Sequence, residues 1–198
     1  MKLIGVTMRV DVHPDYGERR DALDQQWLIF FKACDLTPIF MPNSLELMTS
    51  YLELFQFSGF VLSGGNSPVE YGGDAPERDE IDRYLIDWSI KNNKPILGVC
   101  RGMQSIQQAY DHCLDNVDGH VVKQQKILIN GQQKIVNSYH KLATKTCLLP
   151  LKPWAVSVDG VIKAVKHQNE KVYGIMWHPE RNDPLVQQDI KFFKKIFS

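Results

Sequence analysis

A cysteine flanked by glycines at a predicted strand-to-helix junction constrains this chain more than any other feature. The apolar run over residues 94–97 predicts a buried strand, and Gly98-Val99-Cys100-Arg101-Gly102 follows it, ahead of a predicted helix that begins near Gly102. A sharp turn of this kind holds its central residue in a strained backbone conformation, and small neighbours are needed because a Cβ would collide with the crossing elements. The helix N-terminus also favours a thiolate. Cys100 is therefore a candidate nucleophile.

The order of predicted elements indicates the fold class. We predict strands over residues 3–6, 38–41, 59–62 and 96–99, with helices over residues 21–34, 45–54 and 77–91 between them. This alternation is typical of βαβ units that build a parallel sheet with helices on both faces. The second half predicts short strands over residues 121–130, 132–137, 154–158, 161–167 and 172–177, and a final helix over residues 184–197. The dipeptides Asn130-Gly131 and Asp159-Gly160 between them are strong hairpin signals. We expect one α/β domain over residues 1–198.

Composition argues against several classes of partner. Lys plus Arg and Asp plus Glu number 23 each, so the charge balance does not indicate a nucleic-acid or membrane partner. No apolar stretch is long enough to span a bilayer or to act as a signal peptide. Four scattered cysteines (Cys34, Cys100, Cys113 and Cys147) show neither a CxxC motif nor a disulfide pattern, so we expect a cytoplasmic protein with reduced thiols. The sequence does not define an oligomeric state.

A nucleophilic thiol needs a base, and the base needs an orienting group. The strongest candidate is the sequence Gly174-Ile175-Met176-Trp177-His178-Pro179-Glu180, in which an apolar strand leads directly into His178. In an extended segment, residues two apart share a face, so Glu180 can orient the His178 ring. A lone His-x-Glu more often marks a strand end and a solvated loop. The nucleophile turn in the same chain favours the catalytic interpretation.

Acyl chemistry also requires hydrogen-bond donors for a developing oxyanion. We expect one donor to be the backbone N–H of Arg101 and the other to come from the loop over residues 62–68, where Gly65 allows close approach of the backbone. On this motif alone, a simple turn at Gly64-Gly65 is an equally good interpretation. Neither phosphate-binding spacing of glycines is present. Asn66 of the same loop and the segment Ser138-Tyr139-His140, which follows a predicted strand, are candidate substrate contacts.

These motifs together resemble the class I glutamine amidotransferase superfamily, in the order Cys, His, Glu. The resemblance covers nearly the whole chain and implies a flavodoxin-like three-layer α/β fold with a central, mostly parallel sheet and a small antiparallel insertion that carries Ser138 to His140. It implies that Cys100 is the nucleophile, His178 the base and acid, and Glu180 its orienting group. Gly65 and Arg101 are then the oxyanion donors. Gln104 and the backbone of Ser138 and Tyr139 are expected to hold a γ-glutamyl group, and the implied reaction passes through a γ-glutamyl thioester.

Within this superfamily the chain is similar to the γ-glutamyl hydrolases, because Arg101 follows the nucleophile where synthetase-linked members commonly have an aromatic or aliphatic residue. The chain is shorter than most of these hydrolases, and the sequence after His140 departs from theirs. Its compact form is similar to a bacterial sugar- and capsule-cluster subgroup that includes hydrolases of γ-glutamyl-CDP-amidate. For such a diphosphate substrate, four arginines are candidate anion contacts: Arg9, Arg19, Arg20 and Arg101. For the first three, a solvated loop is the alternative.

Three functional hypotheses follow. The favoured one is a free-standing cysteine hydrolase of small γ-glutamyl amides or amidates. The second is a glutaminase subunit that delivers ammonia to a synthetase partner, which Arg101 disfavours. The third, a binding module without catalysis, is disfavoured by the intact set Cys100, His178 and Glu180. We expect no metal and no cofactor, because the sequence contains no cluster with ligand spacing and a thiolate needs none.

Overall fold

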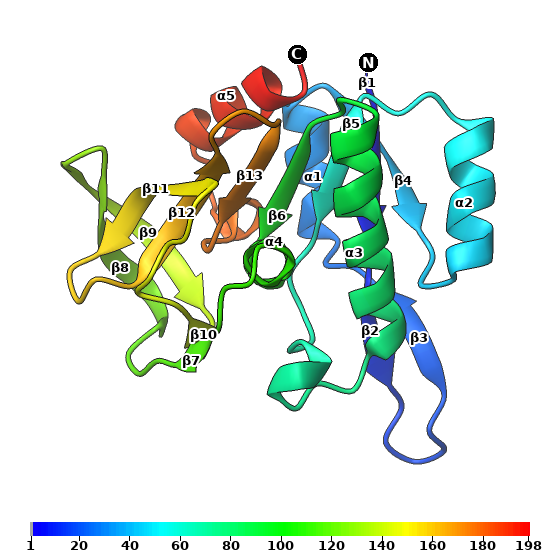
Figure 1. The fold of residues 1–198 in the computed structure, drawn as a ribbon, viewed down its shortest axis with the longest axis horizontal. Coiled ribbons are helices and arrows are strands. Elements are labelled where there is room, and N and C mark those ends of the chain that lie inside the picture. The colour runs from blue at the N-terminus through cyan, green and yellow to red at the C-terminus, as the bar shows by residue number, and fades with distance from the viewer. Residues whose placement is uncertain (1) are drawn as a thin grey trace.

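The computed structural model describes residues 2–198, and a mixed sheet runs through their centre (Figure 1). Its nine strands lie in the order β4-β1-β5-β6-β13-β12-β11-β8-β9. The first five of these are parallel: β4 (Leu36–Met41), β1 (Lys2–Thr7), β5 (Gly59–Leu62), β6 (Ile96–Val99) and β13 (Val172–Ile175). The other four continue the same sheet in antiparallel fashion: β12 (Ile162–His167), β11 (Leu151–Ser157), β8 (Val121–Ile129) and β9 (Gln132–Tyr139).

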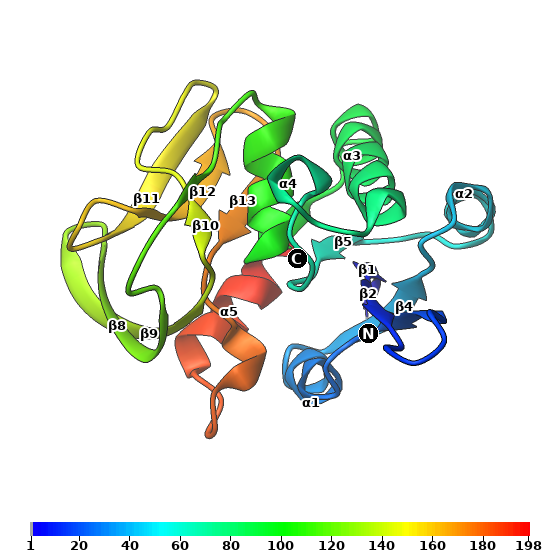
Figure 2. The same ribbon diagram turned by 90° about the horizontal axis from the view of Figure 1, so that it is seen from below.

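Helices cover both faces of the parallel half, as Figure 2 shows. On one face lie α1 (Gln26–Ala33) and α5 (Gln187–Ile196). On the other lie α2 (Leu45–Leu54), α3 (Pro76–Lys91) and α4 (Arg101–Ala109). Short 3-10 helices span Val69–Tyr71 (η1) and Pro179–Arg181 (η2), and two small sheets pair β2 (Arg9–Val12) with β3 (Arg19–Ala22) and β7 (Asp115–Asn116) with β10 (Leu142–Ala143). The predicted three-layer α/β architecture is therefore confirmed.

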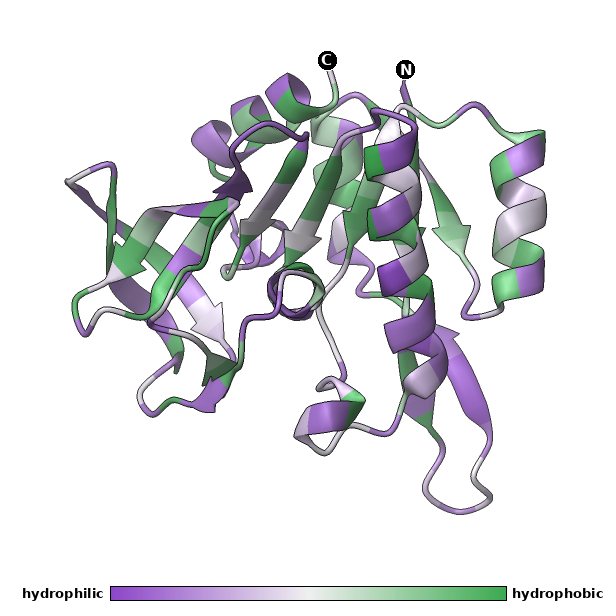
Figure 3. Ribbon diagram, in the orientation of Figure 1, coloured by the Kyte–Doolittle hydropathy of each residue, from purple (hydrophilic) through white to green (hydrophobic). Residues whose placement is uncertain are grey.

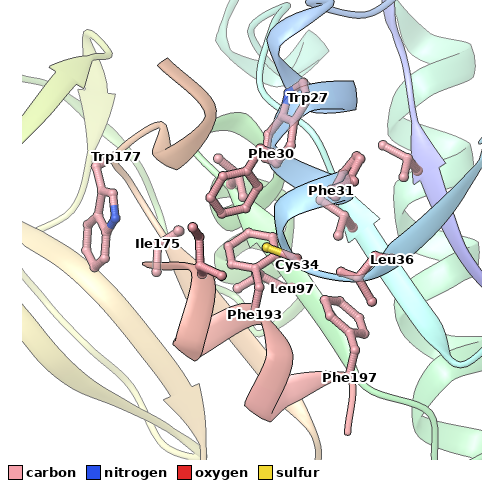
Figure 4. Close-up of a cluster of buried hydrophobic side chains, with 14 of the residues drawn as sticks. Trp27, Phe30, Phe31, Cys34, Leu36, Leu97, Ile175, Trp177, Phe193 and Phe197 are labelled. Atoms are coloured by element: carbon pink, nitrogen blue, oxygen red, sulfur yellow. The ribbon is translucent and has the colours of Figure 1, made fainter. Parts of the chain in front are cut away.

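An aromatic cluster joins α1 and α5 to the sheet (Figure 4). Phe30 of α1 meets Phe193 of α5 edge to face, with ring centroids 4.7 Å apart, and Trp27 stacks on Phe31 at 5.0 Å. All four side chains are buried, and each fully buried aromatic ring contributes about 1.5–3 kcal/mol of transfer free energy. The hydropathy colouring shows the parallel strands as predominantly apolar and α3 as largely polar (Figure 3). The sheet is thus a rigid support for the loops at its carboxyl end.

Most predicted elements are present, with one informative difference. The helix expected over residues 21–34 is shorter, because residues 19–22 instead form β3 and pair with β2 from Arg9↔Ala22 to Val12↔Arg19. The antiparallel strands continue the main sheet beyond β13. Within residues 2–198, no helix has both the length and the apolar character that crossing a bilayer requires.

Candidate active site

Cys100 occupies a strained turn between β6 and α4. Its φ and ψ angles are 53° and −105°, a region that a residue with a Cβ rarely adopts. The flanking glycines are required sterically: a Cβ on Gly98 would lie 2.3 Å from the Gly102 carbonyl, and one on Gly102 would lie 2.1 Å from the Leu62 oxygen. Because each contact is with backbone, neither can be relieved by a side-chain movement. The predicted nucleophile turn is confirmed as a fold feature.

The parallel pairing of β6 and β13 brings the two candidate catalytic segments together. The Cys100 N–H donates to the Ile175 carbonyl at 2.8 Å, so the chain after β13 passes directly beside the turn. His178 and Glu180 follow on that segment, and both are buried. His178 Nδ1 lies 2.7 Å from Glu180 Oε1, although Glu180 stands in the 3-10 helix η2 and not in the extended segment that the sequence predicted.

Asn137 of β9 fixes the backbone of His178, and sequence reasoning did not single it out. Its Oδ1 accepts a hydrogen bond from the His178 N–H at 2.8 Å, and its Nδ2 donates to the His178 carbonyl, also at 2.8 Å. This pair of bonds joins the antiparallel half of the sheet to the segment that carries the imidazole. The position of the ring therefore depends on β9 as well as on β13.

The surroundings of Cys100 and His178 favour the charged forms of both groups. Burial opposes ionisation of the Cys100 thiol, but the charge of His178 and hydrogen bonds from His178 and from the Arg101 N–H outweigh it and lower the thiol pKa from its ordinary value of 9.0. Burial likewise disfavours the His178 imidazolium, yet the Cys100 thiolate and the Glu180 carboxylate together raise the His178 pKa to about 9. The geometry thus supports a thiolate–imidazolium pair.

The Gly64-Gly65 loop, at the carboxyl end of β5, lies against this pair. A Cβ on Gly64 would lie 2.7 Å from His178 Cε1 and 3.6 Å from the Cys100 Cβ. Gly65 has φ of +128°, a conformation that favours glycine. No hydrogen bond from the Gly65 N–H is found within residues 2–198, and the Arg101 N–H faces the Cys100 thiol.

The side chain of Arg101 cannot serve as the anion contact that the sequence suggested, and that expectation is wrong. Its guanidinium is buried and forms ion pairs with Asp79 and Asp82, and it donates to Ser105 Oγ at 2.7 Å. A cation held by two carboxylates inside the protein has no free face for a substrate phosphate. Only the backbone N–H of Arg101 is directed at the candidate site.

The predicted substrate contacts are dispersed around the site. Gln104 is buried on α4 and donates from Nε2 to the Leu142 carbonyl at 2.9 Å. The Tyr139 ring meets the His178 ring edge to face, with centroids 5.8 Å apart. Asn66 bonds through its amide to the N–H and the carbonyl of Val10, at 2.9 and 2.7 Å. The Asn66 side chain therefore holds the loop to β2 and is not directed at the candidate site, contrary to our expectation.

Ser138 and His140 belong to a buried network with Lys163 of β12. Lys163 Nζ donates to Ser138 Oγ at 3.0 Å and lies 2.5 Å from His140 Nε2. Burial, followed by the charge of Lys163, lowers the His140 pKa to about 3. His140 is therefore neutral and accepts a hydrogen bond from Lys163 Nζ. Burial also lowers the Lys163 pKa to about 7. Lys163, which was not predicted from the sequence, thus anchors the Ser138-Tyr139-His140 segment through Ser138 and His140.

A small cavity lies beside the imidazole. Its volume is about 30 Å³, close to that of one water molecule, and it is lined by Arg9, Ala22, Leu23, Asp24, Trp27, Gly64, Gly65, His178, Glu180 and Arg181. The β2–β3 segments, the glycine loop and η2 therefore meet at this point. Across residues 2–198, no three His, Cys, Asp or Glu side chains gather closely enough to hold a metal ion.

The three-layer α/β fold defines the class of protein, together with the cysteine and histidine segments that follow the paired strands β6 and β13. The comparison with known families agrees. The family model for "Glutamine amidotransferase class-I" matches residues 30–195, so the chain belongs to that family. It is 31% identical to the γ-glutamyl-CDP-amidate hydrolase of Campylobacter jejuni over 98% of this chain and 97% of that protein. It is 26% identical to a glutamine-hydrolysing GMP synthase component from Methanococcus aeolicus, over 71% of this chain and 73% of the other.

The fold likeness extends to solved structures. A glutamine amidotransferase from Thermotoga maritima superimposes with a TM-score of 0.66 over 98% of this chain and 83% of that one, at 14% identity. At this identity the likeness concerns the fold alone. The predicted membership of the class I glutamine amidotransferases is therefore confirmed by family and by fold.

Proposed function

We propose that this protein is a cysteine hydrolase that cleaves the amide-type C–N bond of a small γ-glutamyl compound and releases glutamate. The observation that carries the proposal is the arrangement of Cys100 in a strained turn, with its thiol against His178 and with Glu180 Oε1 2.7 Å from His178 Nδ1. A nucleophile, a base and an orienting carboxylate in this order are the requirements of covalent acyl transfer.

In the proposed reaction the Cys100 thiolate attacks the γ-carbonyl carbon, and the carbonyl electron pair moves onto oxygen. The N–H groups of Gly65 and Arg101 stabilise that oxyanion. When the intermediate collapses, the C–N bond breaks and His178 gives its proton to the departing nitrogen. The γ-glutamyl thioester on Cys100 remains.

Hydrolysis of the thioester completes the cycle. His178 then accepts a proton from water, the water oxygen forms a bond to the γ-carbon, and the C–S bond breaks to regenerate the thiolate and release glutamate. We propose that Gln104 and the backbone of Ser138 and Tyr139 hold the α-amino and α-carboxylate groups of the substrate during both steps.

Our specific proposal for the substrate is γ-glutamyl-CDP-amidate. It is supported by the Campylobacter jejuni relative, which matches this chain over almost its full length. Of the four arginines considered from the sequence, Arg9 lines the cavity beside His178, whereas Arg19 and Arg20 are paired with Glu77 and Glu18. Arg181 also lines the cavity, so two cations border it. A γ-glutamyl amine is the next candidate substrate.

Glutamate release by the purified protein tests the proposal. The panel comprises glutamine, several γ-glutamyl amines and γ-glutamyl-CDP-amidate, with Cys100→Ala as the control. Fast release from one substrate other than glutamine, absent in Cys100→Ala, supports a free-standing hydrolase and identifies its leaving group. Slow release from glutamine alone favours the alternative of a glutaminase subunit with a synthetase partner, which the GMP synthase relative keeps open.

A further inference from the structure

Arg78 is a fully buried cation that the proposed chemistry does not use. It is the third residue of α3, and none of its side chain is exposed, although arginine is rarely buried without a charged partner. Within residues 2–198, no carboxylate lies within 4 Å of its guanidinium. An unpaired cation in the protein interior is costly, so its retention calls for a role.

The two terminal nitrogens of Arg78 donate to the glycine loop, whereas its buried Nε has no partner within residues 2–198. Nη2 donates to the Ser63 carbonyl at 2.6 Å and to Ser63 Oγ at 3.1 Å, and Nη1 donates to the Gly64 carbonyl at 2.9 Å. Two successive carbonyl groups are thus held by one planar guanidinium, a fork that a lysine cannot reproduce. Gly64 and Gly65 line the cavity at His178 and Arg78 does not, so Arg78 supports the loop from behind.

The planarity of the peptide bond connects this contact to the oxyanion. In a trans peptide the C=O and the N–H point in opposite directions. Because Arg78 draws the Gly64 carbonyl towards itself, the N–H of Gly65 must point away from Arg78. That N–H is the donor assigned to the oxyanion in the proposed function.

We infer that Arg78 is a positioning residue, which fixes the Gly64-Gly65 peptide so that the Gly65 N–H is directed at the oxyanion. This inference rests on the proposed function, and it adds a role for a residue that touches neither substrate nor thiol. The surroundings of Arg78 leave it charged. Burial lowers its pKa to about 10, while the Cys100 thiolate favours its charged form. The cation therefore stays protonated through neutral pH.

Kinetics of Arg78→Met and Arg78→Lys test this role, with Arg83→Met as the matched control, because Arg83 is an exposed arginine on the same helix. Loss of one oriented oxyanion donor lowers kcat by about a hundredfold, so we expect that loss in Arg78→Met with KM changed less than about threefold. Arg78→Lys keeps the charge without the fork, and we expect about a tenfold loss. Dilute guanidinium should restore part of the turnover of Arg78→Met.

The rate at which iodoacetamide alkylates Cys100 distinguishes an effect of the substitutions on the glycine loop from an effect on the nucleophile turn. Arg78 does not hold the turn, so alkylation at high pH should stay close to that of the unmodified protein in both variants. A kcat equal to that of the unmodified protein in either folded variant contradicts the role of Arg78. A loss of alkylation rate as large as the loss of turnover also contradicts this role. If Arg78→Met does not fold, Arg78→Lys decides. An unmodified protein that hydrolyses no γ-glutamyl compound overturns the proposed function itself.

Discussion

The Oε1 atom of Glu180 lies 2.7 Å from the Nδ1 atom of His178, and at least 97% of each of these side chains is inaccessible to solvent. A carboxylate accepts hydrogen bonds, so the proton between these atoms belongs to Nδ1 of the imidazole. The other ring nitrogen is thereby left to exchange a proton with the thiol. Glu180 Oε2 has no hydrogen-bond partner within residues 2–198, and Oε1 also forms an ion pair with Arg181 Nε at 3.4 Å.

Substitution of Glu180 should therefore impair the reaction less than loss of the imidazole. We expect Glu180→Gln to lower kcat by roughly a hundredfold and His178→Ala to lower it by at least about tenfold more, because the third member of such a triad contributes less than the base. Steady-state glutamate release measures both. Glu53→Gln, at an exposed position on α2, is the control and should match the unmodified protein. Equal losses in Glu180→Gln and His178→Ala would show that Glu180 does more than orient the ring.

The pH dependence of Cys100 alkylation should reveal the ion pair. In the folded protein the thiol pKa is below its ordinary value of 9.0, so alkylation should persist at pH values where a free cysteine is protonated. Removal of the imidazole in His178→Ala leaves burial, which raises the pKa, without its main opposing influence. The midpoint should therefore move to higher pH. A midpoint that does not move would argue against the pair.

Turnover should also decline at high pH. The His178 pKa is raised to about 9, and the proposed mechanism needs the imidazolium to protonate the departing nitrogen. We expect kcat/KM, which reports the free enzyme, to fall as the pH rises through about 9, with the limb displaced to lower pH in Glu180→Gln because that carboxylate favours the imidazolium. A rate profile recorded with a leaving group that needs no proton provides the control, since its alkaline limb should vanish. Retention of the limb there would assign it to another group.

Arg9 should contribute to substrate selection and not to the chemical step. It lines the cavity beside His178, and its own pairing with Asp11 is half-exposed to solvent. A charge-assisted hydrogen bond to a phosphate contributes about 1.5–3 kcal/mol, so Arg9→Ala should raise KM for γ-glutamyl-CDP-amidate by at least about tenfold. KM for a neutral γ-glutamyl amine should not change. Arg20→Ala, on the neighbouring β3, is the control, and an equal effect of both substitutions would point to general electrostatic attraction.

The buried ion pairs of Arg101 should matter for stability. Asp82 is completely buried against the Arg101 guanidinium. Removing one partner of a buried pair costs about 3–5 kcal/mol, and we expect Asp82→Ala to fall near the lower end because Asp79 remains. The free energy of unfolding in urea measures the loss. Glu77→Ala, which breaks the partly exposed pair with Arg19, should cost less than about 1 kcal/mol.

Local patterns were sufficient to predict the elements that carry the nucleophile and the base. The glycine spacing around Cys100 and the apolar run before it depend on steric needs that act over a few residues, so β6 and its turn follow directly from the sequence. The β2–β3 hairpin was missed because the residues of β3 are mostly polar and exposed, without the alternation that indicates a half-buried strand.

The residues that support the site were harder to predict, because their partners are distant in the sequence. The sequence predicted a helix over residues 77–91 but not which of its charged residues are buried. Arg78 and Asp82 share the buried face with Ile81 and Leu85, at the spacing i, i+3, i+4 and i+7. Charged residues at the apolar positions of a helix were the available signal. Asn137 gave no such signal, because its role depends on the tertiary contact between the end of β9 and His178.

The covalent intermediate provides the most direct test of the central claim, that Cys100 attacks a γ-glutamyl carbonyl. Turnover of γ-glutamyl-CDP-amidate is quenched in acid within milliseconds to seconds, and the intact protein and its peptides are analysed by mass spectrometry. The account predicts a mass increase of one glutamyl group, located on the peptide that contains Cys100, absent from Cys100→Ser and removed by hydroxylamine. Glutamate release at the full rate while Cys100 remains unmodified, or from Cys100→Ala, would contradict it.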